Sequence, residues 1–218
     1  DFREDIHFRL VAYFGKGGGV GSFRPDEITT GAWIAGGPRN HDEAMRDGIH
    51  VCVSSWRRIS DDTIPPRVKA GSNYQNSRLA AVEARVNGYD DVVLLTTQGK
   101  VAEAAGASLM LVRDGDLITP AATDGILEGI TRRTLMHLFK RNSGREVIER
   151  TVDRTELYIA DEIFICGSAE EVTPVVSVDR IPVGVGAVGK TTREMQKIFL
   201  DAARGNDQEF VKDLTPVY

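Results

Sequence analysis

A lysine and a tyrosine five positions apart are the first residues whose types and spacing could do chemistry. Lys69 and Tyr74 bound the small, polar segment Lys69-Ala70-Gly71-Ser72-Asn73-Tyr74, which follows Pro65-Pro66 and precedes a helical stretch. A lysine amine can form a Schiff base with a carbonyl compound, and a nearby phenol can tune the acidity of that bond. Most lysines are solvated surface charges, so this assignment depends on what accompanies Lys69.

A carboxylate among small apolar residues is the second feature. Glu103 lies in Val101-Ala102-Glu103-Ala104-Ala105-Gly106, at the end of a predicted apolar strand. A buried carboxylate requires a partner, and a protonated pyridine nitrogen would be one. The alternative is a glutamate in a turn that faces water.

Two short segments could bind anions. In Leu127-Glu128-Gly129-Ile130-Thr131-Arg132, a glycine precedes a predicted helix start, where free backbone N–H groups and the Thr131 hydroxyl suit a phosphate. In Cys166-Gly167-Ser168-Ala169, a turn of small residues after a strand could present N–H groups to a second anion. Each segment alone could equally be an ordinary cap or turn. Lysine, tyrosine, acid and phosphate turn together meet the needs of a site for pyridoxal 5′-phosphate (PLP).

The elements expected to position these residues are mixed strands and helices joined by hairpins, with a flexible glycine-rich turn at 15–21. We expect strands at 6–14, 28–34, 49–54, 91–95, 101–103, 108–113, 162–166 and 175–183, the last a hairpin around Asp179. We expect helices at 77–87, 126–141 and 191–204, and a short capped helix at 153–157. Leu79, Val82 and Val86 share one face of the first helix. The pattern predicts an α+β or α/β fold with a largely antiparallel or barrel-like sheet.

Composition excludes several classes of function. The 218 residues are 41% hydrophobic and 27% charged, with a net charge of -5 and no block of Lys and Arg, which argues against nucleic-acid binding. No apolar run approaches the ~18 residues of a membrane span. Cys52 and Cys166 lie far apart, so we expect neither a disulfide framework nor a metal site, and we expect a cytoplasmic location.

In order and spacing, these segments resemble the class IV, fold-type IV PLP enzymes, most closely the branched-chain aminotransferases. The resemblance runs from about Ile6 to the C-terminus and is carried by the segments 53–58, 69–74, 103–106, 127–132, 158–162 and 167–174. It implies the large C-terminal domain of that fold, a pseudo-barrel of strands surrounded by helices. The expected domain is residues 1–218, a PLP-binding large domain, with the family's N-terminal small domain absent from this chain.

The resemblance also implies roles around the cofactor ring. Lys69 would carry the Schiff base and move the proton between Cα of the substrate and C4′ of the cofactor. Tyr74 would bind the ring hydroxyl, Glu103 the pyridine nitrogen, and Leu127 would pack on the ring face.

Further roles follow for the anionic groups of cofactor and substrate. Gly129, Ile130 and Thr131 would hold the phosphate at the start of the helix, and Ser168 would add a hydroxyl. The turn of Ser168 and Ala169 would also receive the α-carboxylate of the substrate.

The expected substrate pocket departs from that of the branched-chain enzymes. Their pocket strand usually carries Tyr-Ile-Arg, whereas this chain has His7-Phe8-Arg9, so Arg9 is kept and His7 replaces the tyrosine. The usual Gly-Ala-Tyr-Leu-Gly loop is replaced by the segment 36–40. Arg39 in that loop could bind a second carboxylate, or it could be a solvated loop arginine.

The implied activity is transamination between an amino acid, branched-chain or another hydrophobic L-amino acid, and a 2-oxo acid such as 2-oxoglutarate. The implied partners are these small molecules, further copies of the chain in a homodimer or higher homo-oligomer, and the absent small domain. Two alternatives stay open: a D-amino-acid or (R)-amine transaminase of the same fold, and a PLP-binding or dimerisation fragment without turnover.

Overall fold

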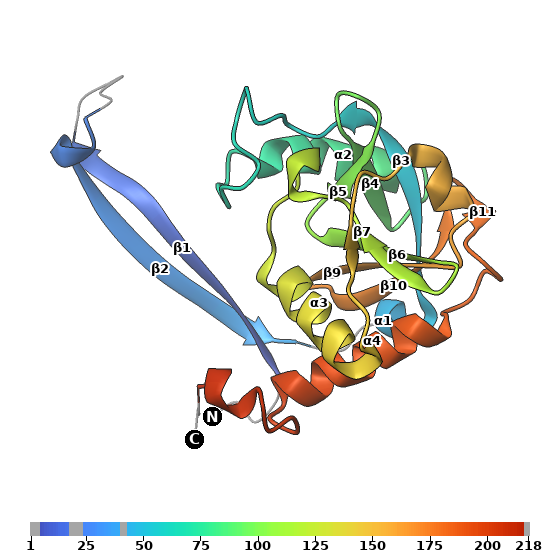
Figure 1. Cartoon of the computed structure of the whole chain (residues 1–218). Helices are drawn as coiled ribbons and strands as arrows, with labels where there is room; N and C mark the ends of the chain where they lie inside the picture. The colour runs from blue at the N-terminus through green and yellow to red at the C-terminus, as the bar shows by residue number, and fades with distance from the viewer. Residues whose placement is uncertain (1–4, 18–23, 40–42, 216–218) are drawn as a thin grey trace. The chain divides into compact units, whose positions relative to one another are not determined.

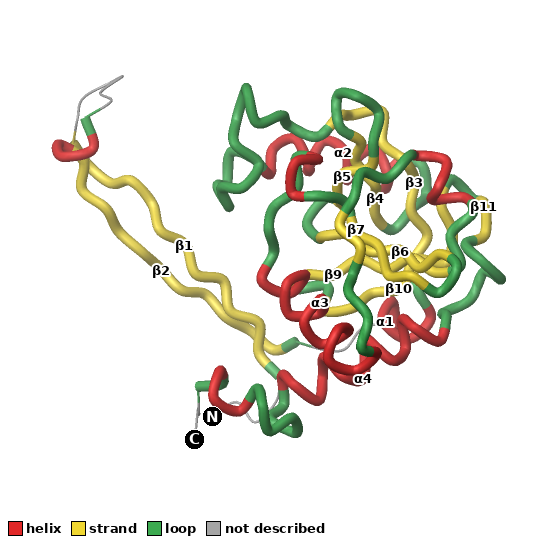
Figure 2. Tube along the Cα trace, viewed as in Figure 1, coloured by secondary structure: helices red, strands yellow, loops and turns green. Residues whose placement is uncertain are grey.

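The chain divides into two compact units, Asp1–Asp42 and Glu43–Tyr218. The computed structural model describes residues 5–17, 24–39 and 43–215 (Figures 1 and 2). Most of the glycine-rich turn expected at 15–21 lies outside these ranges.

The first unit is a two-stranded antiparallel sheet of β1 (Ile6–Gly17) and β2 (Ile28–Pro38), with the short 3-10 helix η1 (Pro25–Glu27) before β2. Because side chains alternate between faces, Phe8, Leu10 and Phe14 share one face of β1. Leu10 pairs with Ile34, and these four apolar side chains are 64–77% exposed. The hairpin therefore carries one strongly apolar face.

The prediction that this strand covers only residues 28–34 was wrong, because β2 continues through Gly36 to Pro38. Gly36 pairs with Phe8, and a Cβ at Gly36 would lie only 2.7 Å from Cδ1 of the Phe8 ring. The missing side chain leaves room for the ring to cover the opposite strand, which is a known use of glycine inside a sheet.

The second unit is built on one nine-stranded sheet, seen with its helices in Figures 1 and 2. Its strands are β3 (Ile49–Arg57), β4 (Asp91–Leu95), β5 (Val101–Ala104), β6 (Ser108–Arg113), β7 (Asp116–Thr119), β8 (Ile148–Glu149), β9 (Glu162–Gly167), β10 (Glu171–Val178) and β11 (Ile181–Pro182). The order is β5-β4-β3-β10-β9-β6-β7-β8, with β11 paired to β10. Only β3/β4, β3/β10 and β7/β8 pair in parallel among the described strands, so the expected largely antiparallel character is confirmed.

The two outer edges of this sheet meet. The Val101 N–H on β5 donates to the carbonyl of Val152, just beyond β8, at 2.9 Å, and Lys100 bridges to Asp153 beside it. Along β6, Leu109 and Leu111 pack into the largest core cluster, while the alternate residues pack into a second cluster with α3 and α4 side chains. The sheet therefore curls around its own core, and the predicted pseudo-barrel is confirmed.

The helices are α1 (Glu43–Asp47), α2 (Tyr74–Val86), α3 (Ile130–Ser143) and α4 (Lys190–Ala203), with the 3-10 turns η2 (Ala122–Asp124), η3 (Arg154–Tyr158) and η4 (Val211–Asp213). Helix α2 packs on the sheet through Ala80 and Ala84. Leu79, Val82 and Val86 do share a face, as predicted, but that face is 49–81% exposed. Small alanines, rather than the larger apolar residues, permit close approach to the strands.

The third helix begins later than the sequence predicts. Residues 126–129 are not helical, and α3 starts at Ile130. Gly125 has φ 71°, a left-handed conformation that favours glycine, and Gly129 is extended at φ -66°, ψ 140°. The chain therefore reaches the helix in an open conformation that leaves Leu127 in a connecting segment.

The short helix predicted at 153–157 is present as η3, and Glu156 stabilises it. The Glu156 carboxylate accepts the Asp153 N–H at 3.1 Å and binds Arg150 at 2.6 Å and Arg113 at 3.2 Å. Hydrogen bonding from Arg150, opposed by burial and aided by the Asp153 amide, lowers the pKa of Glu156 to about 2.

A pH-dependent contribution to stability follows from Glu156. Its folded-state pKa lies below the ordinary glutamate value of 4.5, so the stabilisation is present above pH 4.5 and is lost as the pH falls towards 2. We expect Glu156→Gln to lower the melting temperature at pH 7 and to converge with the parent near pH 2. Thermal melts between these pH values measure this; a constant difference would contradict it.

No helix within the described ranges is both long enough and apolar enough to cross a membrane. Among the same residues there is no group of His, Cys, Asp and Glu side chains that could hold a metal ion.

Candidate cofactor site

One pocket in the second unit, of about 290 Å³, gathers the side chain of Arg58, just beyond β3, and side chains from four further parts of the chain. These four parts are the loop before α2, β5 with its connection to β6, the start of α3, and the turn between β9 and β10. All of the residues predicted to hold the cofactor line it: Lys69, Tyr74, Glu103, Leu127, Gly129, Ile130, Thr131 and Ser168. Their roles in binding stay predictions.

The amine and the phenol meet directly. Nζ of Lys69 donates a hydrogen bond to Oη of Tyr74 at 2.9 Å. Lys69 is exposed on its loop, whereas Tyr74, the first residue of α2, is half-buried. The phenol oxygen therefore holds an otherwise mobile amine at the pocket.

The carboxylate of Glu103 lies at the inner end of the pocket and is only 6% exposed. Its Oε1 binds Arg58 at 2.7 Å, and its Oε2 accepts the Leu127 N–H at 3.0 Å. Burial raises the pKa of Glu103 to about 7, while the Arg58 charge and the Leu127 amide act in the opposite direction. A further positive charge brought to this carboxylate would favour its ionised form.

Arg58 is a site residue that the sequence did not identify. It lies just beyond β3 and is buried, with Nε donating to the Gly125 carbonyl at 3.1 Å and a second nitrogen on Glu103. In the sequence it follows Arg57 at a strand end and resembles a solvated charge. Arg58 is buried because it binds Glu103 on β5, and this long-range contact cannot be predicted from the residues around Arg58.

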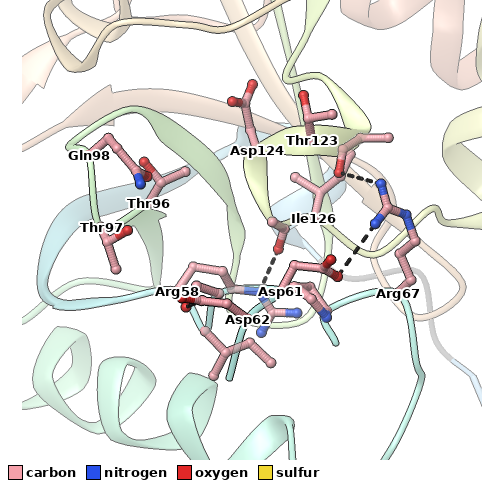
Figure 3. Close-up of a pocket in the computed structure, with 15 residues that line it drawn as sticks. Arg58, Asp61, Asp62, Arg67, Thr96, Thr97, Gln98, Thr123, Asp124 and Ile126 are labelled. Carbon is pink, nitrogen blue, oxygen red and sulfur yellow. Dashed lines mark hydrogen bonds and ion pairs between the residues drawn. The ribbon is translucent and has the colours of Figure 1, made fainter. Parts of the chain in front are cut away.

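Arg58 also lines a second, larger cavity of about 650 Å³. Figure 3 shows this cavity between the loop that carries Asp61 and Arg67, the loop with Thr96, and the segment with Asp124. Arg58 therefore lines both cavities, and its Nε–H is hydrogen-bonded to the Gly125 carbonyl.

The opposite side of the cofactor pocket suits an anion. The first N–H groups of α3, at Ile130 and Thr131, have no acceptor within the helix, and the helix dipole adds partial positive charge there. Gly129 lines the pocket without a side chain, and a Cβ there would lie 3.3 Å from Oγ of Ser108. Its backbone is therefore open to a ligand in the pocket. Ser168 faces the pocket from the exposed turn after β9.

The residues predicted to bind the substrate are distributed differently. His7 pairs with Gly37 and Arg9 with Ala35 in the first unit, on the face opposite Phe8. The Arg39 N–H, just beyond β2, donates to the Asp5 carbonyl at 2.6 Å. In the second unit, Ala169 follows Ser168 in the same turn. The structure keeps His7, Arg9 and Arg39 within the hairpin unit, and their substrate role stays a prediction.

An amine, a buried carboxylate and an anion-binding helix start around one pocket define a site of the PLP-dependent class. The family model described as "Amino-transferase class IV" matches residues 5–178. The chain therefore belongs to the class IV aminotransferases, which are PLP-dependent transaminases, and the resemblance seen in the sequence is confirmed.

Individual relatives agree with this assignment. A probable branched-chain-amino-acid aminotransferase of Aquifex aeolicus is 42% identical over all of this chain, which spans 70% of that protein. A branched-chain-amino-acid aminotransferase of Salmonella typhimurium is 42% identical over 91% of this chain and 65% of its own length. The PLP form of the Thermobaculum terrenum branched-chain amino acid aminotransferase superimposes with a TM-score of 0.92 at 43% identity, covering 100% of this chain and 70% of that one.

The residues of the pocket fit PLP on observations of this structure alone. A buried carboxylate with a pKa raised to about 7 can take a pyridinium as partner. The bare backbone at Gly129 and the unbonded amides of α3 can take a phosphate. Lys69 presents an amine to the same space.

Proposed function

We propose that this chain is the cofactor-binding portion of an aminotransferase for branched-chain or other hydrophobic L-amino acids, with a 2-oxo acid such as 2-oxoglutarate as acceptor. The observation that carries the proposal is the single pocket joining Lys69, Tyr74, Glu103 and the start of α3. The names of the relatives support the substrate class. Because the chain spans about two thirds of their length, the activity of a whole protein is part of the proposal.

The domain assignment extends the same proposal. Residues 1–218 would act as the PLP-binding large domain, completed by an N-terminal small domain. The greater length of the relatives supports this, while the division at Asp42 gives the hairpin a unit of its own.

PLP supplies, when bound, an aldehyde that condenses with amines and an electron-poor ring that stabilises negative charge at the substrate Cα. The amine of Lys69 would hold the cofactor between turnovers and, once the substrate amine has displaced it, would move the proton between Cα of the substrate and C4′ of the cofactor. Tyr74 holds the ring hydroxyl and keeps the Lys69 amine in place through the 2.9 Å contact. Glu103 keeps a proton on the ring nitrogen, helped by Arg58, which favours the ionised carboxylate.

The anionic groups are bound by backbone and hydroxyl donors. The amides of Ile130 and Thr131 and the hydroxyls of Thr131 and Ser168 hold the phosphate. The turn with Ala169 receives the α-carboxylate of the substrate. Arg9, His7 and Arg39 contribute to the substrate pocket, and Leu127 packs on the ring.

Addition of PLP should produce a visible absorbance band, and borohydride reduction followed by peptide mapping should place the adduct on Lys69. Donor assays with 2-oxoglutarate should then favour L-leucine over D-alanine and (R)-phenylethylamine. An adduct elsewhere would contradict the site. An adduct on Lys69 with preference for D-alanine or the amine would instead contradict the substrate class. An adduct without turnover would identify a binding fragment.

We also propose a cytoplasmic homodimer or larger homo-oligomer. The free thiols of Cys52 and Cys166, both buried, support a reducing compartment. The exposed apolar faces of β1 and α2 support association. Light scattering during size-exclusion chromatography measures the assembly, and a strictly monomeric mass would contradict it.

A further inference from the structure

Helix α2, which follows the loop of Lys69, begins without the side-chain hydrogen bond that usually caps a helix. Asn73 is the N-cap of α2, a position at which asparagine commonly accepts a hydrogen bond from the second or third helical N–H. Here its side chain makes no capping hydrogen bond, and its backbone is helical at φ -65°, ψ -30°. The side chain, only 2% exposed, is therefore used for something other than the helix.

The Asn73 amide instead holds the loop that carries Lys69. Nδ2 donates to the Pro65 carbonyl at 3.0 Å and to the Val68 carbonyl at 2.9 Å. The backbone N–H of Asn73 donates to the Ala70 carbonyl at 3.1 Å. These three acceptors lie on both sides of Lys69, so one buried residue fixes the backbone immediately before and after it.

Other hydrogen bonds of the loop are short-range backbone bonds, from the Val68 N–H to the Pro65 carbonyl at 3.2 Å and from the Ala70 N–H to the Val68 carbonyl at 2.8 Å. Val68 is 52% exposed, so apolar packing contributes little there, and Arg67 binds Glu128 in an exposed ion pair at 2.7 Å. Exposed ion pairs contribute little to holding a backbone in place. Tyr74, the partner of Lys69, directly follows Asn73 in the chain. The same residue therefore fixes both ends of the contact between Lys69 and Tyr74.

We propose that Asn73 is a positioning residue: it holds the Lys69 loop so that the amine meets Tyr74 in the cofactor pocket. This inference rests on the proposed function for its effect on chemistry, but its structural half is independent of any cofactor. Asn73→Asp keeps the size of the side chain and a residue type favoured at helix starts, yet it removes both N–H donors. Asn76→Asp is the matched control, because Asn76 lies on the same helix and donates to the Arg57 carbonyl at 2.9 Å, away from the loop.

The first test needs no cofactor. Trypsin cleaves after Arg67 and Lys69, which lie within the loop, and its rate under native conditions reports how often the loop opens. Asn73→Asp should be cleaved there about tenfold faster than the parent, the change expected from the lost hydrogen bonds, and Asn76→Asp should match the parent. Equal rates for the parent and a folded Asn73 variant would overturn the inference.

The second test uses the PLP-loaded protein and the pH titration of its visible band. Asn73→Asp should shift the midpoint by about one pH unit and lower kcat more than it raises KM for the donor, because the loop no longer holds the Lys69 nitrogen at a fixed separation from the Tyr74 phenol. In a Tyr74→Phe background, Asn73→Asp should shift the pH midpoint of the band little further, because Asn73 acts through the Tyr74 phenol and that group is already absent. Full additivity would overturn the inference.

Failures of the two proposals can be told apart. Should Asn73→Asp not fold, as its circular dichroism and melting would show, Asn73→Ala takes its place in both tests. If the unchanged chain gives no adduct on Lys69, the proposed function is contradicted, while the trypsin comparison still decides whether Asn73 holds the loop. If the adduct forms but trypsin rates and titration midpoints match the parent, Asn73 has no positioning role.

Discussion

Replacing Lys69 with alanine is expected to abolish the visible band and the borohydride-trapped adduct, and to reduce any transamination by about 10⁴-fold or more. Lys69 supplies the one amine at the pocket wall among the described residues, and its Nζ is held at 2.9 Å from Tyr74. The same variant should leave the melting temperature of the cofactor-free protein nearly unchanged, because the side chain is exposed. Absorbance spectra, mass mapping and thermal melts measure these three effects.

Lys197→Ala is the matched control for this experiment. Lys197 is an exposed lysine on α4 whose ion pair with Asp201, at 2.8 Å, lies on the helix surface. Its loss should change neither the band nor the adduct. A trapped adduct that persisted in Lys69→Ala would contradict the assignment of Lys69.

Arg58→Met is expected to lower PLP-dependent turnover at pH 7 by about a hundredfold, as the loss of a buried electrostatic partner typically does. The methionine fills the space but removes the guanidinium that binds Oε1 of Glu103, so the pKa of Glu103 rises further above its value of about 7. A protonated Glu103 cannot keep a positive charge on the ring nitrogen. Turnover should therefore recover partly as the pH is raised, and a pH profile of kcat measures this.

The ionisation of Glu103 should also set a pH dependence of the free energy of unfolding. The folded-state pKa of Glu103 lies above the ordinary glutamate value of 4.5, so the cofactor-free protein loses stability as the pH rises from 4.5 towards 7. Arg58→Met should extend this loss to higher pH, and Glu103→Gln should remove it. Arg57→Met, at the exposed neighbouring arginine, is the control and should behave as the parent. Equal pH profiles for the Arg58 and Arg57 variants would contradict the role of the ion pair.

The pocket residues could be predicted because each is carried by a local pattern. Lys69 and Tyr74 share one short segment, and Gly129 precedes the residues that begin α3. The partner of Glu103 could not be predicted in this way. Arg58 reaches it only because β3 and β5 flank β4 in the same sheet, and such long-range pairing has no periodic signature.

The predicted ends of two elements were wrong at glycines, which can adopt more than one backbone conformation. The strand predicted at 28–34 continues through Gly36, which leaves room for the Phe8 ring within the sheet. Before α3, the apolar residues from Ile126 onward resemble a helix start, yet the left-handed Gly125 and the extended Gly129 delay that start to Ile130. In both places, tertiary contacts selected one of several conformations that the sequence permits.

The strand order of the curled sheet bears on how the protein is synthesised. β3 lies between β4 and β10, both parallel to it, and β10 (Glu171–Val178) comes from the last third of the second unit. During translation, the edge of β3 that pairs with β10 therefore stays unpaired until most of the unit has left the ribosome. Contacts so distant in sequence form slowly and leave apolar strand exposed meanwhile. Lys69 and Glu103 are thus made early, but the turn between β9 and β10, which brings Ser168 to the same pocket, is made much later.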